Sequence, residues 1–123
     1  MGLFNAMLGN ASDADPDEIA EEYAPILADG ETVEAAFKMV RDLYIFTSKR
    51  LILVDKQGMT GRKAEYRSIP YRAVTQFSVE NAGTFDSDAE MRIWVSGQAE
   101  PLSRQLKRGA NVEAIQKALA SIL

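Results

Sequence analysis

Apolar and polar residues alternate with a period of two through much of the chain after residue 32. Ser78 separates Phe77 from Val79, for example, and residues 91–95 repeat the pattern. This period is that of a half-buried β-strand. The breaks between these segments are too short for crossover helices, so we expect an antiparallel sheet. The predicted strands are residues 33–39, 43–46, 50–55, 64–71, 75–79, 91–95 and 101–107.

The last of these segments is the weakest strand prediction. Arg104 has the same parity as Leu102 and Leu106, so a regular strand would point a charge toward the apolar face. A bulge or a strand end would resolve the conflict.

Helical spacing appears at both ends of the chain. Residues 2–9 read as a short amphipathic helix, and Asp15 followed by Pro16 reads as the N-cap and first turn of a second helix. Pro25 should kink or stop that helix. Near the end, Asn111 is a candidate N-cap. The apolar face of the last helix comprises Val112, Ile115, Leu119 and Ile122.

Seven antiparallel strands cannot leave both edges and an apolar face exposed to water. A curled sheet, closed at one end by the last helix, satisfies both needs. The predicted fold is therefore mainly β with flanking helices: a seven-stranded antiparallel partial barrel capped by a C-terminal helix. We divide the chain into an N-terminal helical arm, residues 1–30, and the barrel with its helix, residues 31–123.

Composition limits the chemistry. The chain has 123 residues, which suits one domain with a sizeable core. It has no Cys and no His, which excludes disulfides, thiolate metal sites and the usual general base. No apolar run approaches a membrane span, and the first residues make a poor signal peptide. Position six is Ala6, where myristoylation requires Ser or Thr. We expect a soluble cytoplasmic protein.

Charge is distributed unevenly. Residues 1–37 carry nine acidic and no basic side chains, whereas residues 38–123 carry nine acidic and fourteen basic ones. Such asymmetry suggests an arm that docks on its own body or on a neighbour, and uneven surface charge is the plainer alternative.

Basic residues are densest between residues 38 and 72, around the turn "SKR". They suggest a patch for anionic contacts: lipid headgroups, nucleic acid or the acidic arm of a neighbouring subunit. A hydrated turn with edge-strand charges is the structural alternative. We favour the neighbouring arm over nucleic acid, since the protein is acidic overall. The candidate residues are Lys49, Arg50, Arg62, Lys63, Arg67 and Arg72.

Two other motifs carry no catalytic or metal prediction. "KQGMTGRK" lacks the ending and the following helix of a phosphate loop, and its glycines suit a turn. "FDSDAE" spaces three carboxylates by two, but it lacks the flanking helices of a calcium loop. We expect no cofactor, no metal and no enzymatic activity.

A candidate subunit interface comes from apolar residues with no obvious cover. Leu3, Phe4, Met7 and Leu8 are too many for so short a helix to hide, and a membrane would favour basic neighbours, which are absent. They would pack on their own barrel or on a second subunit. Trp94 lies opposite Ile93 and Val95, facing either a partner or the N-terminal helices.

Two long runs resemble the bacterial pleckstrin-homology (PH) domain family. They are "FTSKRLILVDKQGMTGRKAEYRSIPY" and "FSVENAGTFDSDAEMRIW", close to the family runs "FTxKRLILVDKQGxTGKKxEYxSIPY" and "FSVExAGxFDxDxELxxW". The likeness covers nearly the whole chain. Arg62 and Met59 depart from the family's Lys and frequent Leu. The resemblance implies a PH-type barrel that self-associates, with ring-shaped assemblies among relatives and no catalytic motif or agreed ligand.

We therefore predict a homo-oligomeric scaffold or protein-binding module that self-associates through strand edges and the N-terminal arm. The alternative is a peripheral adaptor that holds anionic lipid headgroups with its basic patch.

Overall fold

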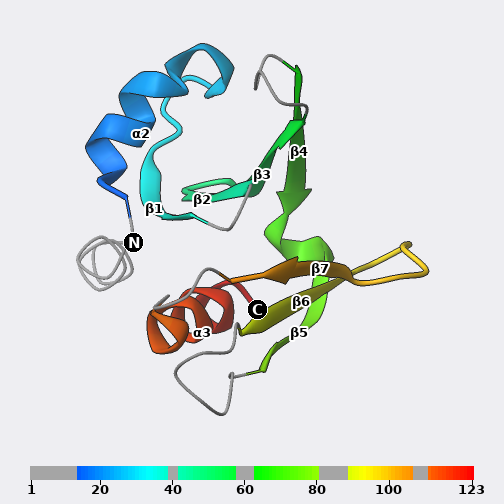
Figure 1. Ribbon diagram of the computed structural model, residues 1–123. Coiled ribbons are helices and arrows are strands. Elements are labelled where there is room, and N and C mark those ends of the chain that lie inside the picture. Colours follow the sequence, from blue (N-terminus) through cyan, green and yellow to red (C-terminus); the bar gives the residue numbers. More distant parts are fainter. Residues whose placement is uncertain (1–13, 39–41, 58–62, 81–88, 107–110) are drawn as a thin grey trace.

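Seven strands form two antiparallel sheets, and a helix lies against each sheet (Figure 1). The computed structural model describes residues 14–38, 42–57, 63–80, 89–106 and 111–123. In chain order the elements are α2 (Pro16–Glu22), the 3₁₀ helix η1 (Ala24–Ile26), β1 (Val33–Lys38), β2 (Asp42–Thr47), β3 (Arg50–Gln57), β4 (Lys63–Pro70), the 3₁₀ helix η2 (Tyr71–Ala73), β5 (Val74–Glu80), β6 (Glu90–Val95), β7 (Leu102–Gln105) and α3 (Val112–Ile122).

Both sheets are simple meanders. The first has the order β1-β2-β3-β4 and the second β5-β6-β7. Every pair of neighbours is antiparallel, as the short breaks between the alternating segments predicted. The chain passes from one sheet to the other through η2, directly after β4.

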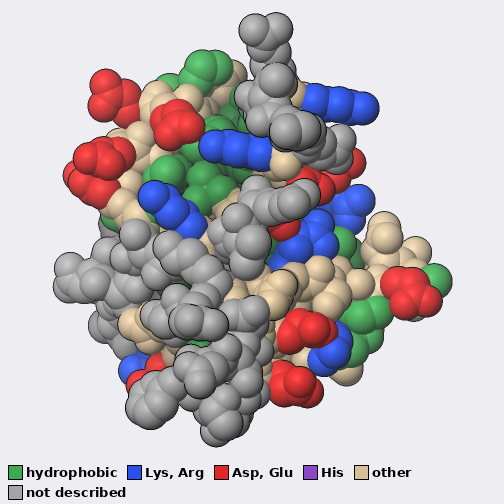
Figure 2. Space-filling model, in the orientation of Figure 1, with side chains coloured by type: hydrophobic (Ala, Val, Ile, Leu, Met, Phe, Trp, Pro, Cys, Tyr) green, Lys and Arg blue, Asp and Glu red, His purple; other side chains and the backbone are tan. Residues whose placement is uncertain are grey.

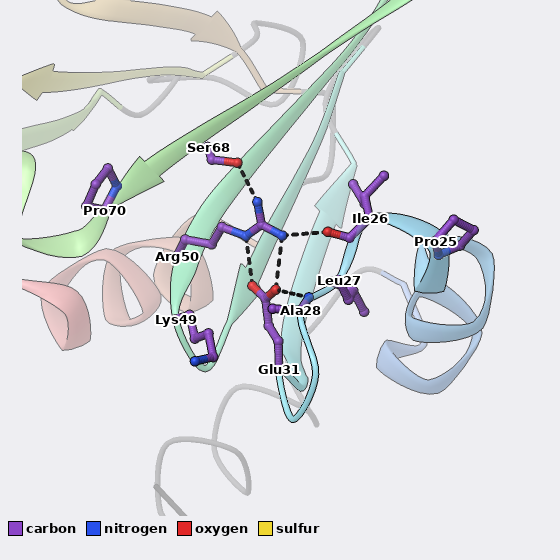
Figure 3. A pocket seen from close by; sticks show the side chains of 9 residues that line it. All are labelled: Pro25, Ile26, Leu27, Ala28, Glu31, Lys49, Arg50, Ser68 and Pro70. Atoms are coloured by element: carbon purple, nitrogen blue, oxygen red, sulfur yellow. Dashed lines mark hydrogen bonds and ion pairs between the residues drawn. The ribbon is translucent and has the colours of Figure 1, made fainter.

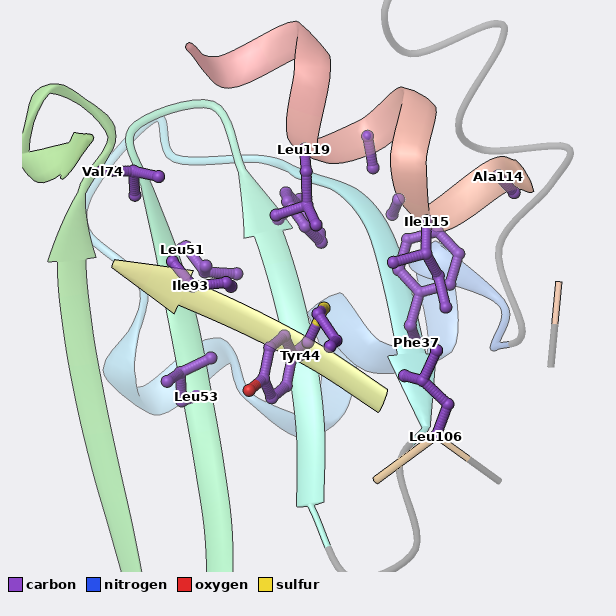
Figure 4. Packing of buried hydrophobic residues seen from close by; sticks show 14 of the residues in the cluster. Phe37, Tyr44, Leu51, Leu53, Val74, Ile93, Leu106, Ala114, Ile115 and Leu119 are labelled. Atoms are coloured by element: carbon purple, nitrogen blue, oxygen red, sulfur yellow. The ribbon is translucent and has the colours of Figure 1, made fainter. Parts of the chain in front are cut away.

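One core joins the two sheets and α3 (Figure 4). Phe37 and Phe46 meet edge to face in the first sheet, with ring centroids 5.8 Å apart. Ile115 and Leu119 of α3 are 1% and 0% exposed in the same core. Each such side chain contributes roughly 1.5–3 kcal/mol when fully buried. The helix starts as predicted, because Asn111 Oδ1 accepts a hydrogen bond from the Ala114 amide at 3.1 Å.

A second core lies on the opposite face of the first sheet, under α2. Ile19 and Tyr23, both 6% exposed, pack on residues of β1, β2 and β3. Asp15 caps the helix by accepting from the Asp17 amide at 3.0 Å. As predicted, Pro25 ends regular helix and lies in η1. The described part of the arm therefore packs on its own barrel.

β1 departs from the predicted one-sided alternation. Val33 and Ala35 were expected on one face, but a register shift lies between them. Val33 joins the core under α2, whereas Ala35 joins the core between the sheets. With helices on both sides of the barrel, β1 is buried on both faces except at Lys38. Met39, the predicted end of this strand, lies outside the described residues.

An ion pair connects the two sheets and resolves the conflict in β7. Arg104 Nε bonds to Asp42 Oδ2, on the first residue of β2. Asp55 of β3 stands opposite Asp42 in register. Burial raises the pKa of Asp42, while Arg104 opposes that rise. The inward charge of Arg104 is therefore held by a carboxylate of the other sheet, and β7 ends one residue later, at Gln105.

Candidate functional site

The turn between β2 and β3 is organised by Thr47. Its Oγ1 accepts hydrogen bonds from the amides of Lys49 and Arg50, at 3.1 and 3.0 Å. The same hydroxyl donates to Glu31 Oε2 at 2.6 Å. "SKR" is thus a tight turn in which Thr47 satisfies the amides of Lys49 and Arg50, and the backbone of Arg50 faces β2.

Arg50 is held in place by Glu31, from the segment before β1 (Figure 3). Arg50 Nε donates to Glu31 Oε2 at 2.9 Å, and Nη2 donates to Oε1 at 3.0 Å. Nη2 also donates to the Ile26 carbonyl, and Nη1 to Ser68 Oγ, both at 2.7 Å. This two-pronged pairing fixes the plane of the guanidinium.

The carboxylate of Glu31 is strongly stabilised in its charged form. Its side chain is 0% exposed, and the Ala28 amide donates to Oε1 at 2.9 Å. The bonds from Arg50 lower the pKa of Glu31 from 4.5 to about 2, with help from Thr47 and against the opposing effect of burial. The pair therefore ties η1, the β2–β3 turn and β4 together.

The residues of the predicted basic patch differ in their exposure and in their partners. The side chain of Arg50 is 26% exposed, but its guanidinium is held by hydrogen bonds to Glu31, Ile26 and Ser68, so it is a structural cation here. Lys49 is exposed, and its ammonium forms no ion pair with the described residues. Arg67 is 43% exposed at its side chain and lies 3.8 Å from the Glu65 carboxylate. Arg62 lies outside the described residues.

The remaining cations do not form one group. Arg50 pairs with Pro70 in register, so Lys49 and Arg72 lie near that end of β3 and β4. Lys63 pairs with Gln57 at the other end. The seven residue steps from Lys63 to Pro70 span about 23 Å at the usual rise of a strand. The predicted patch is therefore divided along β4.

β4 itself is unusually open for a strand of eight residues. Six of its residues are exposed, and only Ile69 is buried. Tyr66 is 52% exposed and meets Tyr23, directly after α2, edge to face, with ring centroids 6.4 Å apart. Among the described residues, β4 pairs with β3 alone, so its other edge is unpaired.

A pocket lies beside this strand, on the face that α2 and η1 cover (Figure 3). Its volume is about 390 Å³, and its walls are mainly apolar. The pair of Glu31 and Arg50 lines it, and Lys49 stands at its margin. The other lining residues are Pro25, Ile26, Leu27, Ala28, Ser68 and Pro70.

The predicted subunit interface is only partly described. Trp94 is half-buried and stands opposite Gln76 in register, while Met91 and Ile93 are buried in the core. The alternation that sets Trp94 on the other face from Ile93 is therefore present. Leu3, Phe4, Met7 and Leu8 lie outside the described residues, and their role stays a prediction.

Sequence reasoning did not find Glu31 or the pair of Asp42 and Arg104. Glu31 lies 19 positions from Arg50, and no local pattern connects the two. The inward parity of Arg104 was a signal, since a charge on an apolar face requires a partner. In the described residues no cluster of acidic side chains is arranged to hold a metal ion.

The sequence profile of the family described as "Bacterial PH domain" matches residues 2–123. The chain belongs to the bacterial PH domain family. Its two antiparallel sheets and C-terminal helix are the fold predicted from that resemblance.

Relatives of this bacterial PH domain cover almost its full length. "Uncharacterized protein YjqA" of Bacillus subtilis is 54% identical over 123 residues, which is 99% of this chain and 98% of that protein. A crystallised pleckstrin homology domain from Shewanella amazonensis is 58% identical, with a TM-score of 0.78, and covers 88% of this chain and 97% of that one. A second, from Shewanella loihica, is 50% identical with a TM-score of 0.78, covering 90% and 95%.

The PH fold is generally non-catalytic. Among the described residues, no helix of this bacterial PH domain is long and apolar enough to cross a bilayer.

Proposed function

We propose that this bacterial PH domain is a non-enzymatic scaffold that assembles into homo-oligomers by head-to-tail contact between unlike faces. The observation that carries this proposal is the separation of charge on its surface. An acidic face on one copy can meet a basic face on the next, and a head-to-tail contact of this kind closes into a ring when the rotation permits.

The acidic face is the outer side of α2, at the upper left of Figure 2. Asp17, Glu18 and Glu21 are exposed there. None of them forms an ion pair with a Lys or Arg of the described chain. Within the described part of the subunit their charge is therefore not offset by a cation, and we take this face as the one that a partner meets.

The basic face lies around the C-terminal end of β4, which is next to the β2–β3 turn. Lys49 and Arg72 are exposed near that end, and Arg67 lies along the strand. Complementary charges of this kind raise the rate of association and fix its direction more than they add affinity. The half-buried Trp94 supplies further contact area.

Light scattering on the full chain tests the proposal. Glu21→Lys reverses a charge on α2, and we expect it to lower the average mass at micromolar concentration. The matched control is Glu100→Lys, which makes the same charge change at an exposed position between β6 and β7. The control should leave the mass unchanged. Equal behaviour of the two variants would remove the electrostatic basis of the proposal.

Anionic vesicles separate this proposal from the lipid-adaptor alternative. We expect no pelleting with phosphatidylserine vesicles at low salt, because the basic face has three exposed cations among the described residues, fewer than the roughly four to eight that bind anionic lipid surfaces. Binding that disappears at high salt would instead support an adaptor.

A further inference from the structure

The backbone of β4 presents hydrogen-bonding groups to the edge that no described strand occupies. Thr47 Oγ1 lies 3.0 Å from both the amide nitrogen and the carbonyl oxygen of Arg50, so Arg50 faces β2. Its partner in register, Pro70, must then face away from β3. Proline is tolerated in such a position because its missing N–H would point outward. By the alternation of the ladder, the N–H and C=O groups of Ser68 and Tyr66 also face the open edge.

The pocket lies on the same side as the side chains of these edge-facing residues. Ser68 and Pro70 belong to β4 and line the pocket, and Tyr66 follows on the same face two residues before Ser68. Ile26, which is 36% exposed, forms part of the opposite wall. A chain added along β4 would therefore place one side chain over the pocket and another, two residues away, beside Tyr66.

Charge at the two ends of this surface is unequal. Glu31 and Arg50 neutralise each other at the pocket, which leaves Lys49 as the uncompensated charge at the margin. At the other end, Glu22 lies beside Tyr23, and Tyr23 contacts Tyr66. An acidic group is therefore favoured at the Lys49 end and disfavoured at the Tyr66 end.

We propose that β4 and this pocket bind an extended segment of a partner protein, added as a fifth strand to the first sheet. The segment carries two apolar side chains spaced by two residues and an acidic residue beyond the one that fills the pocket. The open edge supplies affinity through main-chain hydrogen bonds, and the pocket supplies specificity. This site goes beyond the proposed assembly, since it gives each subunit a place to hold a client.

Fluorescence anisotropy with a labelled peptide tests the proposal on the full chain. The probe is Asp-Asp-Leu-Thr-Leu-Thr-Asn, used together with its reversed sequence because the added strand can run in either direction. We expect saturable binding of one of them at micromolar concentration. A peptide with both leucines replaced by asparagine, and one with both aspartates replaced by lysine, should each bind at least about fivefold more weakly.

Variants of the protein locate the site. Ser68→Pro removes an N–H that faces the open edge and leaves the ladder to β3 intact, so it should weaken binding at least about tenfold. Ser68→Ala loses only the hydroxyl that accepts from Arg50, and it should bind like the native chain. Ile26→Glu places a charge in the apolar wall of the pocket and lies outside the strands. Lys49→Glu reverses the charge that we expect to attract the acidic residue of the peptide. Both should weaken binding.

The proposal is overturned if neither leucine peptide binds saturably, or if Ile26→Glu and a folded Ser68→Pro bind like the native chain. Its failure is separable from failure of the proposed assembly. Peptide binding is read at the level of the subunit, whereas assembly is read from the mass in light scattering.

Discussion

At the scale of single residues, Arg50 was predicted as a surface contact for anions. In the folded chain its guanidinium instead pairs with the buried carboxylate of Glu31. The basic density around "SKR" led us to predict Arg50 as part of a patch for anionic contacts. Residues 1–37 contain nine acidic side chains, and nothing in the sequence distinguishes Glu31 from the others as the partner of Arg50. The pairing is visible only in the folded structure. Lys49, one residue earlier, lies in the turn itself and stays exposed.

The pKa of Glu31 predicts an acid-sensitive contribution to stability. Between pH 4.5 and about 2 the unfolded chain holds a proton on Glu31 that the folded chain lacks, so acidification favours unfolding. The contribution, on the order of 3 kcal/mol, is complete above that window and is lost through it. Glu31→Gln should lower the free energy of unfolding by about 2–3 kcal/mol at pH 7. It should also flatten the dependence on pH below 4.5.

Urea denaturation at several pH values, followed by the emission of Trp94, measures this. Glu65→Gln is the control, because that carboxylate is 52% exposed and its pair with Arg67 is long, so its removal should change stability little. If the stability of Glu31→Gln depended on pH as that of the native chain does, the Glu31–Arg50 pair would not be the source of the acid sensitivity.

At the scale of elements, alternation and capping residues predicted most of the structure. Each of the seven strands was expected within a few residues of its observed position, and Asp15, Pro25 and Asn111 act as predicted. The bulge in β1 was not predictable. β1 is covered on both faces, and burial on two faces weakens the alternating signal that would reveal a shift in register.

The final helix should behave as the plug of the barrel. Leu119 is 0% exposed between the sheets, so Leu119→Ala should lower the free energy of unfolding by about 2–5 kcal/mol through the lost burial and the cavity. Gln116→Ala, on the exposed side of α3, should stay within about 0.5 kcal/mol. Calorimetry of the two variants checks this, and equal melting temperatures would contradict the plug.

At the scale of the whole molecule, the two sheets are joined by a shared core and by the pair of Arg104 and Asp42. Removing Arg104 leaves a buried carboxylate opposite Asp55 without its cation. Arg104→Gln should therefore cost about 2 kcal/mol at pH 7. Because burial raises the pKa of Asp42, the folded variant binds a proton more readily than the unfolded chain, and part of the loss should return as the pH falls.

Adding Asp42→Asn to that variant should restore stability at pH 7, since the stranded charge is gone. Denaturation of the single and double variants at pH 7 and pH 5 measures this. A double variant as unstable as Arg104→Gln alone would show that the charge of Asp42 is not responsible.

Self-association is the central proposal for this molecule; sequence resemblance suggests it, and the separation of surface charge supports it. Light scattering on the native chain, over a range of concentrations and salt, tests it most directly. One chain weighs 13.6 kDa. We predict a mass several times larger at low salt, decreasing as salt screens the contact between the acidic and basic faces. A mass of 13.6 kDa at every concentration and salt would contradict the account.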